Sequence, residues 1–285
     1  ILNHDEKPID LTVRIEAASD FADLFQVKDA LQKEGAYSTQ VEDGKLVLSY
    51  RRETFTRATT ISSSEPCQID QAGLSFQIRI EPHGSWKTEL DVRASVPGVP
   101  DAETPSILAW EAVRPVSDMA LDLQHWLDSA PRLECDWDSL RTSYLRSLVD
   151  LAALRFSPVT AGGRSLPAAG LPWFMTMFGR DSILTSLQVL PFTQELAATT
   201  LRELGLRQGT RIDDFRDEDP GRILHEMRYG EMTAFEERPH SPYYGSADAT
   251  PLYVVLLDEY ERWTGDLELV RELEFEARAA LNWID

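Results

Sequence analysis

The stretch Leu-Pro-Trp-Phe-Met-Thr-Met-Phe-Gly-Arg-Asp-Ser-Ile-Leu-Thr-Ser-Leu, residues 171–187, places two adjacent opposite charges inside an otherwise apolar passage. From Ile183 onward the apolar residues have helical spacing, so Arg180 and Asp181 stand where an aromatic loop passes into a helix. Charged side chains are rarely buried unless they are paired or functional. Either Asp181 or Ser182 caps the helix, or the charged pair takes part in binding.

Helical spacing dominates the rest of the second half. After Asp136, apolar residues recur every three or four positions, which predicts a nearly all-helical region whose helices pair as hairpins. Trp263 and Trp283, at helical spacing, are expected in the core. No Gly or Pro stop signal precedes Asp285, so we expect the helical domain to be cut short there. The apolar stripes cover residues 140–154, 183–190, 196–207, 252–263 and 266–281.

The first half has a different period. Ile9, Leu11, Val13 and Ile15 occur at every second residue, and the alternation recurs in residues 74–80 and 86–92, which predicts half-buried strands. Asp43-Gly44, between two apolar runs, is typical of a two-residue hairpin turn. These features predict an antiparallel β-sandwich over residues 1–97, which would lack earlier strands if the N-terminus is truncated.

Proline-rich sequence separates the two halves. Pro97-Gly98-Val99-Pro100 and Pro105 break the strand pattern, as a linker does. The apolar positions from Met119 to Leu127 are compatible with one helix face. We therefore predict an α+β multidomain chain: a β-sandwich over 1–97, a linker with a helix over 98–135, and a helical domain over 136–285.

Composition narrows the class of partner. The net charge of −20, from 48 acidic and 28 basic residues, argues against nucleic acid and anionic membranes, whose phosphates would be repelled. The negative charge is compatible with a neutral ligand such as a sugar. Alternatively, the charge serves only to keep the protein soluble. No run approaches the roughly 18 apolar residues that a membrane-spanning helix needs.

The termini and cysteines suggest where the protein works. The chain starts without Met or a signal peptide, so we expect it to begin inside a longer protein. Cys67 and Cys135 lack metal-ligand spacing, and two buried free thiols are typical of a reducing compartment. These features predict a cytoplasmic protein.

Two connections in the helical half are too long to be turns. They run from about 157 to 179 and from about 209 to 247, and loops of this length in a compact domain are usually functional or disordered. The first is too apolar to be disordered. The second mixes aromatic rings with carboxylates and arginines. Rings that stack on pyranose faces, and charged groups that bind hydroxyls, are the inventory of a sugar pocket.

Several residues in these loops have plain alternative interpretations. The acidic run 213–219 is either a solvated surface or a Ca²⁺ ligand set, although it lacks the spacing of an EF-hand. His225-Glu226 is not a His-Glu-x-x-His zinc motif, because Tyr229 stands where the second His belongs. His240 looks isolated and structural. Asp248 could cap a helix that has a proline in its first turn. No metal or cofactor is expected.

Three motifs in the helical second half of the chain resemble those of a known protein family. Residues 173–182 (WFMTMFGRDS), 215–231 (FRDEDPGRILHEMRYGE) and 243–251 (YYGSADATP) resemble, in order and spacing, the bacterial amylo-α-1,6-glucosidase or glycogen-debranching-type family. Residues 1 to about 97 resemble the N-terminal β-domain of the same family. The resemblance covers most of the chain and is more specific after residue 136.

The resemblance implies a fold and a sugar site. The fold is the (α/α)₆ barrel of six-hairpin, glucoamylase-like glycosidases, of which 136–285 would be the first hairpins. An Arg-Asp pair at the second helix holds hydroxyls of the sugar whose bond is cut, and Arg180 and Asp181 match it. Without sugar, the two charges are expected to neutralise each other. The expected substrate-binding residues are Trp173, Phe178, Arg180, Asp181, Glu226, Arg228, Tyr243, Tyr244 and Asp248.

The resemblance also implies hydrolysis of α-glucosidic bonds with inversion, by one acid and one base. In the family the acid lies in a Trp-Lys-Asp stretch and the base is a Glu near the end of the barrel. Here Trp86-Lys87 is followed by Thr88, so we expect the catalytic dyad outside this chain and the isolated fragment to be inactive, with Glu226 as the in-chain candidate. The alternatives are another six-hairpin glycosidase (trehalose, mannosyl-glycerate or rhamnoside substrate) or a non-catalytic carbohydrate-binding protein.

Overall fold

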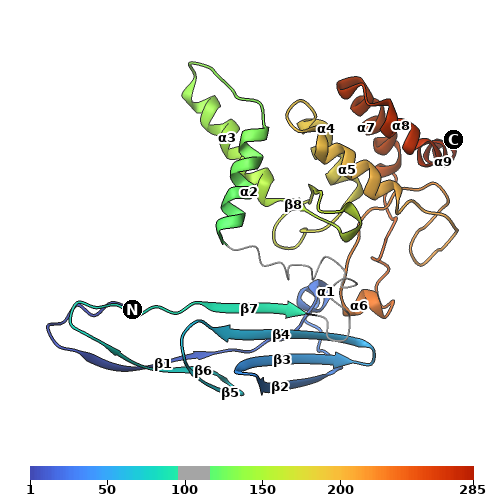
Figure 1. The fold of residues 1–285 in the computed structure, drawn as a ribbon. Coiled ribbons are helices and arrows are strands. Elements are labelled where there is room, and N and C mark those ends of the chain that lie inside the picture. The colour runs from blue at the N-terminus through green and yellow to red at the C-terminus, as the bar shows by residue number, and fades with distance from the viewer. Residues whose placement is uncertain (96–115) are drawn as a thin grey trace. The chain divides into compact units, whose positions relative to one another are not determined.

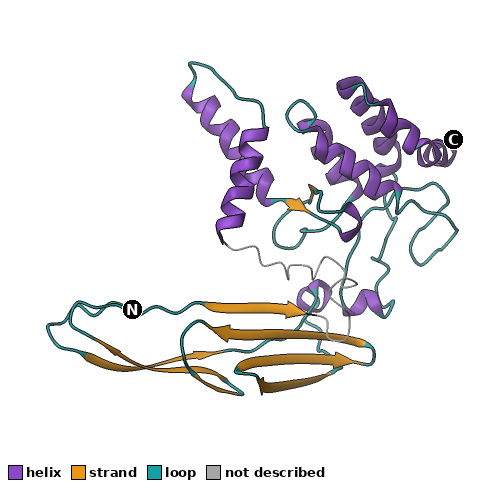
Figure 2. Cartoon of the chain, in the orientation of Figure 1, coloured by secondary structure: helices purple, strands orange, loops and turns teal. Residues whose placement is uncertain are grey.

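The computed structural model of the protein describes residues 1–95 and 116–285 (Figure 1). The chain divides into two compact units, Ile1–Ala112 and Val113–Asp285. Most strands belong to the first unit and most helices to the second (Figure 2). The proline-rich sequence that predicts a linker, from Pro97 to Pro105, lies outside the described residues.

The first unit contains two antiparallel sheets and one short helix, α1 (Leu24–Lys28). One sheet has the strand order β1-β6-β5, and the other has the order β2-β3-β4-β7. The strands are β1 (Ile9–Glu16), β2 (Ala36–Glu42), β3 (Lys45–Arg52), β4 (Phe55–Ser63), β5 (Gln68–Asp70), β6 (Gly73–Ile80) and β7 (Leu90–Ser95).

The alternating stripes of the sequence meet across the sheets. Val13 of β1 lies opposite Phe76 of β6, and Ile15 lies opposite Leu74. Residues directly opposite each other project from the same face, so the two stripes form one apolar surface. Leu46, Leu48 and Ile61 of the second sheet pack with Leu74 and Phe76 in a single buried cluster. The predicted antiparallel sheet domain is confirmed, with its core between the two sheets.

The predicted hairpin at Asp43-Gly44 is also confirmed. Glu42 of β2 pairs with Lys45 of β3, which leaves a two-residue turn. Asp43 has a φ of 49° and Gly44 a φ of 72°, as a type I′ turn requires at both central positions. This turn matches the right-handed twist of the strands and fixes their register.

The strand predicted from Trp86 is wrong in its first half, because β7 begins only at Leu90. Trp86 instead packs its ring edge-on against Phe76, with centroids 5.2 Å apart, and its backbone N–H donates to the carbonyl of Ile1. Val92 is 55% exposed, because β7 is the outermost strand of its sheet. An alternating pattern shows which residues share a face and does not show whether that face is covered.

The second unit is mostly helical, and it also holds a 3₁₀ turn and a two-stranded ribbon. The helices up to the second long connection are α2 (Val116–Ser129), α3 (Asp138–Ala153), α4 (Gly179–Val189) and α5 (Gln194–Gly205). The later helices are α6 (Glu231–Ala234), α7 (Ala249–Thr264), α8 (Leu267–Glu272) and α9 (Glu274–Ile284). The remaining elements are the strands β8 (Arg155–Phe156) and β9 (Leu166–Pro167) and the 3₁₀ turn η2 (Val159–Ala161).

The core of this unit lies where α4, α5 and α7 pack against one another. Each contributes apolar residues at helical spacing, such as Tyr253, Leu256 and Tyr260 of α7. Helices adjacent in the chain also pack together, with α2 against α3 and α4 against α5. The predicted change from strand to helical architecture is therefore confirmed.

Some helix predictions need correction. In α3 only Leu148 is buried, whereas Leu140 and Leu145 are exposed, because the helix packs mainly against α2. The final segment is not one helix: α8 and α9 are separated at Leu273. Trp263 is 54% exposed rather than in the core, since α7 ends one residue later.

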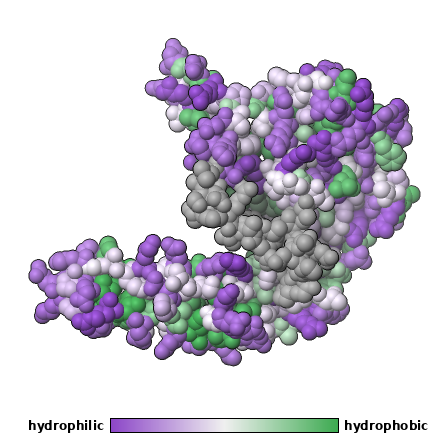
Figure 3. Space-filling model, in the orientation of Figure 1, coloured by the Kyte–Doolittle hydropathy of each residue, from purple (hydrophilic) through white to green (hydrophobic). Residues whose placement is uncertain are grey.

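Two other expectations concern membranes and thiols. Among the described residues, no helix combines the length and apolar character needed to cross a bilayer. Cys67 and Cys135 are free, but they are half-buried rather than buried. Burial raises the pKa of the Cys67 thiol. The visible face of each unit is largely hydrophilic (Figure 3), as expected for a chain of net charge −20.

Candidate functional site

Backbone hydrogen bonds bring the three sequence motifs of the second unit together. The segment 225–227 lies in the middle: Gly179 N–H donates to the carbonyl of His225 at 2.9 Å, and Met227 N–H donates to the carbonyl of Met177 at 3.1 Å. On its other side, Tyr243 N–H donates to the carbonyl of Glu226 at 3.0 Å. We name the chain between α3 and α4 the first loop (154–178) and the chain between α5 and α7 the second loop (206–248).

Close packing at Gly179 fixes the start of α4. A Cβ atom on Gly179 would lie 2.1 Å from the carbonyl oxygen of Leu224 and 2.8 Å from the Cβ of Ala249. Only glycine fits without backbone movement. Because Ala249 is the first residue of α7, the beginnings of α4 and α7 are held against the same part of the second loop. This packing brings Asp248 next to Arg180.

Arg180 and Asp181 are not each other's closest partners. Arg180 Nη1 lies 3.2 Å from Asp248 Oδ2, whereas Arg180 Nε lies 3.9 Å from Asp181 Oδ2. All three side chains are partly exposed, at 47% for Arg180, 37% for Asp181 and 42% for Asp248. Burial alone would raise the pKa of Asp248, but hydrogen bonding and the charge of Arg180 bring it below its ordinary value. Arg180 is therefore held by Asp248, and the expected mutual neutralisation with Asp181 is only loose.

The helix-capping alternatives are not what the structure shows. Phe178 occupies the N-cap position of α4, so Asp181 and Ser182 lie inside the first turn. Asp248 occupies the N-cap position of α7, but its side chain makes no capping hydrogen bond. In the part of the chain that the structure describes, no hydrogen bond to the Asp181 carboxylate is found. The carboxylate oxygens are therefore available to accept hydrogen bonds from a ligand. The N-terminal end of α4 also favours the negative charge of Asp181.

Glu226 lies at the centre of a mostly buried polar cluster. Arg228 donates to Glu226 Oε2, with its Nη2 at 3.0 Å, and His240 Nε2 lies 3.0 Å from Glu226 Oε1. The side chains of all three residues are at most 17% exposed. Arg228 Nη1 also donates to the carbonyl of Trp173 at 2.6 Å. The cluster thus joins two separate parts of the second loop, at Glu226 and at His240, and ties them through Arg228 to the first loop.

These contacts do not suit Glu226 to the role of a general acid. Burial alone would raise its pKa, but the hydrogen bond from His240 and the charge of Arg228 outweigh burial and lower the pKa below its ordinary value. A general acid at neutral pH needs a raised pKa. Both oxygens already accept hydrogen bonds, so the arrangement is that of an anchoring carboxylate.

The predicted aromatic residues divide into exposed and buried ones. Trp173 is 49% exposed, whereas Phe178 is 5% exposed and Tyr244 is 3% exposed. The Tyr244 hydroxyl donates to the carbonyl of Arg207 at 2.8 Å, which makes it part of the core. Tyr243 is half-buried, and a hydrogen bond with Asp217 raises its pKa. Of the four, Trp173 has the most free ring surface for stacking on a sugar.

Two residues that the structure places beside the candidate site were not predicted as site residues from the sequence. His240 is not isolated, because it contacts Glu226 and also packs against the ring of Tyr243 with centroids 5.0 Å apart. Phe174 is half-exposed and packs against Phe178, with centroids 5.9 Å apart. Phe174 lies inside the quoted aromatic motif, which was a signal for it. Nothing in the spacing indicated that His240 would meet Glu226 across a long loop.

The acidic run in the second loop is cross-linked by arginines. Glu218 is 8% exposed and accepts from the backbone N–H of Thr210 at 2.9 Å, and Arg211 lies beside it. Asp213 pairs with Arg211 at 2.9 Å. Within the described residues, no group of three or more His, Cys, Asp or Glu side chains is arranged to hold a metal ion. The run is therefore partly an internal ion-pair network rather than simply a solvated surface.

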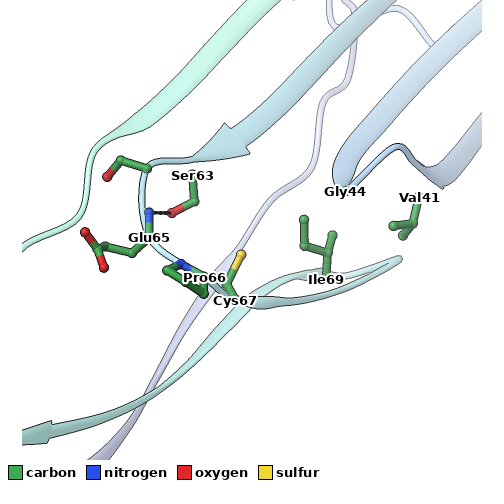
Figure 4. A pocket seen from close by; sticks show the side chains of 8 residues that line it. Val41, Gly44, Ser63, Glu65, Pro66, Cys67 and Ile69 are labelled. Atoms are coloured by element: carbon green, nitrogen blue, oxygen red, sulfur yellow. Dashed lines mark hydrogen bonds between the residues drawn. The ribbon is translucent and has the colours of Figure 1, made fainter.

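A separate pocket of about 420 Å³ lies in the first unit (Figure 4). Its polar groups are engaged internally: Ser63 Oγ accepts from the N–H of Glu65 at 3.1 Å, and Ser64 Oγ accepts from Glu89 N–H at 3.0 Å. The raised pKa of Cys67 keeps its thiol protonated. These groups offer no convergent charged pair, so the pocket does not replace the second unit as the candidate site. Its lining consists of Val41, Gly44, Ser63, Ser64, Glu65, Pro66, Cys67 and Ile69.

Comparison with known proteins adds the following. Residues 1–91 match the family described as the N-terminal domain of (some) glycogen debranching enzymes. No curated protein matches the chain. One solved structure that matches is a "Putative kojibiose phosphorylase from human microbiome", with 10% sequence identity and a TM-score of 0.41. The match covers 86% of this chain and 36% of that structure, so the chain spans about a third of its length. A likeness this distant does not indicate a function for this chain.

The family match covers residues 1–91, which lie in the first unit. The two antiparallel sheets of residues 1–91 are the part of the chain for which sequence comparison gives a family. This match confirms the resemblance that the first part of the sequence shows: residues 1–91 are similar to the N-terminal domain of (some) glycogen debranching enzymes.

Proposed function

We propose that the protein is a glycoside hydrolase that acts on α-glucosidic bonds of glycogen-like α-glucans, as an amylo-α-1,6-glucosidase does. One observation carries the proposal: at the start of α4, Arg180 is held by Asp248 while the Asp181 carboxylate stays open to ligands. The family match of residues 1–91 supports the same substrate class. We further propose that the helices of the second unit are part of an (α/α)₆ barrel.

The exposed groups suit a glucosyl unit. The Arg180 guanidinium can donate to two neighbouring hydroxyls, and the Asp181 carboxylate can accept from a third. The same stretch of chain carries Trp173, whose half-exposed ring can stack on the apolar face of a pyranose. Asp248 keeps the guanidinium in place before the sugar arrives, which lowers the entropic cost of binding.

The bond-breaking step needs two further carboxylates. In an inverting enzyme an acid protonates the glycosidic oxygen, while a base roughly 6.5–9.5 Å away activates water. Glu226 is held on both oxygens and has a lowered pKa, so we assign it to anchoring. We propose that the acid and base belong to a part of the protein outside residues 1–285, and that the enzyme works in the cytoplasm.

The test compares Asp181→Asn with Asp258→Asn in the whole protein. Asp258 is a matched control, because it is an exposed aspartate paired with Arg262 on α7. With panose as the probe, titration calorimetry should show affinity reduced about tenfold or more in Asp181→Asn, because a charged hydrogen-bond acceptor is lost. Asp258→Asn should bind panose like the unchanged protein. Equal affinities in both variants would remove the assigned role of Asp181.

Glucose release tests the reaction itself. The whole protein should release glucose from panose, which has one α-1,6 bond, and the isolated residues 1–285 should not. Activity on trehalose but not on panose would point to another glycosidase of the same fold. Binding of panose without hydrolysis by the whole protein would point to a carbohydrate-binding protein.

A further inference from the structure

A buried ion pair between Glu203 of α5 and Arg207, just after that helix, takes no part in the proposed sugar contacts. The Glu203 side chain is 4% exposed and that of Arg207 is 15% exposed, with Arg207 Nη1 2.6 Å from Glu203 Oε2. Arg207 Nη1 also donates to the backbone carbonyl of Glu203 at 3.0 Å. An exposed pair four residues apart on a helix contributes little, whereas a buried pair must be fully hydrogen-bonded to be tolerated.

The first loop completes this network. Thr160, on η2, donates its hydroxyl proton to Glu203 Oε2, and its oxygen accepts from Arg207 Nη2 at 2.9 Å. A hydroxyl can donate one hydrogen bond while it accepts another, so Thr160 fits between the carboxylate and the guanidinium. The 3₁₀ turn of the first loop is thereby fastened to α5.

A later part of the second loop is fastened to Arg207, which itself lies near the start of that loop. The hydroxyl of the buried Tyr244 donates to the backbone carbonyl of Arg207 at 2.8 Å. Tyr229, from the middle of this loop, also lies near the pair: burial raises the pKa of its phenol, and the nearby charge of Arg207 opposes that rise. Arg207, near the start of the second loop, therefore bonds the first loop through its guanidinium and the far end of the second loop through its carbonyl.

We propose that Glu203 and Arg207 are positioning residues that make the first and second loops open and close as one unit. Loosening one loop frees Arg207, and the other loop then loses one of its anchors. These loops carry Trp173 and Asp248, so ordering of one by a ligand would order the other. The coupling concerns the protein's own motions and does not depend on which ligand the site takes.

Two isosteric substitutions test the coupling. Thr160→Val removes the hydroxyl of the first loop, and Tyr244→Phe removes that of the second. Hydrogen exchange is measured in the whole protein on peptides that cover 157–164 and 240–246. Each variant is expected to speed exchange about fivefold in the loop that it does not touch, as well as in its own. Tyr260→Phe is the control, because its hydroxyl bonds Asp266 between α7 and α8, and it should change neither loop.

The outcomes separate this inference from the proposed function. If each substitution speeds exchange only in its own loop, the coupling does not exist, whether or not the protein binds panose. Glu203→Gln should speed exchange in both loops together, and failure of that variant to fold would leave the two hydroxyl variants as a sufficient test. If the loops are coupled, 240–246 becomes more protected when panose binds the unchanged protein and less so in Thr160→Val.

Discussion

An ion pair in the sheets of the first unit and one in the loops of the second differ in burial. In the first unit, Arg79 pairs with Asp10 across strands while their side chains stay 56% and 73% exposed. In the second, the Arg228 and Glu226 side chains are 11% and 12% exposed and touch both loops. Exposed pairs are screened by water and contribute little, whereas a buried charge that loses its partner is costly. Charge therefore serves mainly solvation in the sheets and architecture in the loops.

Backbone hydrogen bonds show the same contrast. In the first unit, β1 and β6 pair over eight consecutive positions, from Ile9–Ile80 to Glu16–Gly73. In the second unit, Phe178, Glu226 and Tyr243 are joined only by isolated bridges. A long register persists when one contact is lost. Isolated bridges depend on the side chains and close packing around them, so the candidate site should be the more sensitive of the two regions.

The largest expected effect comes from removing a buried cation. Arg228→Ala leaves the Glu226 carboxylate buried with His240 as its remaining partner and should lower the free energy of unfolding of the second unit by about 3–5 kcal/mol. Arg79→Ala in the first unit should cost much less, because its exposed ion pair is screened by water. Urea denaturation, followed by hydrogen exchange in α4 and in β6, measures each unit separately. Equal losses of unfolding free energy in the two variants would contradict the difference between buried and exposed ion pairs.

A smaller effect is expected from crowding the start of α4. Gly179→Ala places a methyl group 2.1 Å from the Leu224 carbonyl, so the backbone must move, at a cost of about 1–3 kcal/mol. Gly170→Ala is the control, since its Cβ would meet Phe174 at an ordinary 3.9 Å, and it should change stability by about 0.5 kcal/mol or less. Thermal unfolding monitored by circular dichroism tests both. If Gly179→Ala leaves the unfolding temperature unchanged, the backbone at Leu224 can move away without loss of stability.

The smallest effect is a change in pH dependence. The pKa of Glu226 in the folded protein lies below its ordinary value of 4.5, so ionised Glu226 adds stability that is present above pH 4.5 and is lost as the pH falls through the folded pKa. Glu226→Gln lacks this titration. The unchanged protein should be the more stable one at pH 7, and the difference should shrink below pH 4.5. Urea denaturation at both pH values measures it, and a constant difference would argue against the ionised anchor.

The sheets were the more predictable region, because their information is local. Asp43-Gly44 determines a type I′ turn by residue type alone, and Val13 and Ile15 determine an inward face by alternation. Where this reasoning failed, at Val92, the cause was position at a sheet edge, which no local pattern encodes. The quoted aromatic motif likewise identified the start of a helix, but not that Phe178 would occupy its N-cap position.

The partners within the candidate site could not be predicted. Arg180 stands next to Asp181 in the chain and yet lies closer to Asp248, because the tight fit of Gly179 against Leu224 and Ala249 holds the start of α4 beside the start of α7. His240 reaches Glu226 only because the second loop folds back on itself. Sequence spacing does not contain these distances.

The sequence by itself determined the two architectures, the hairpin register and the residue types that suit a sugar, since propensity, period and side-chain chemistry are local properties. Only the tertiary structure decided which charges pair, which aromatic rings are exposed, and that Glu226 anchors loops. These features arise when segments tens of residues apart meet. Burial then changes the strength of each charge interaction according to neighbours that the sequence does not place side by side.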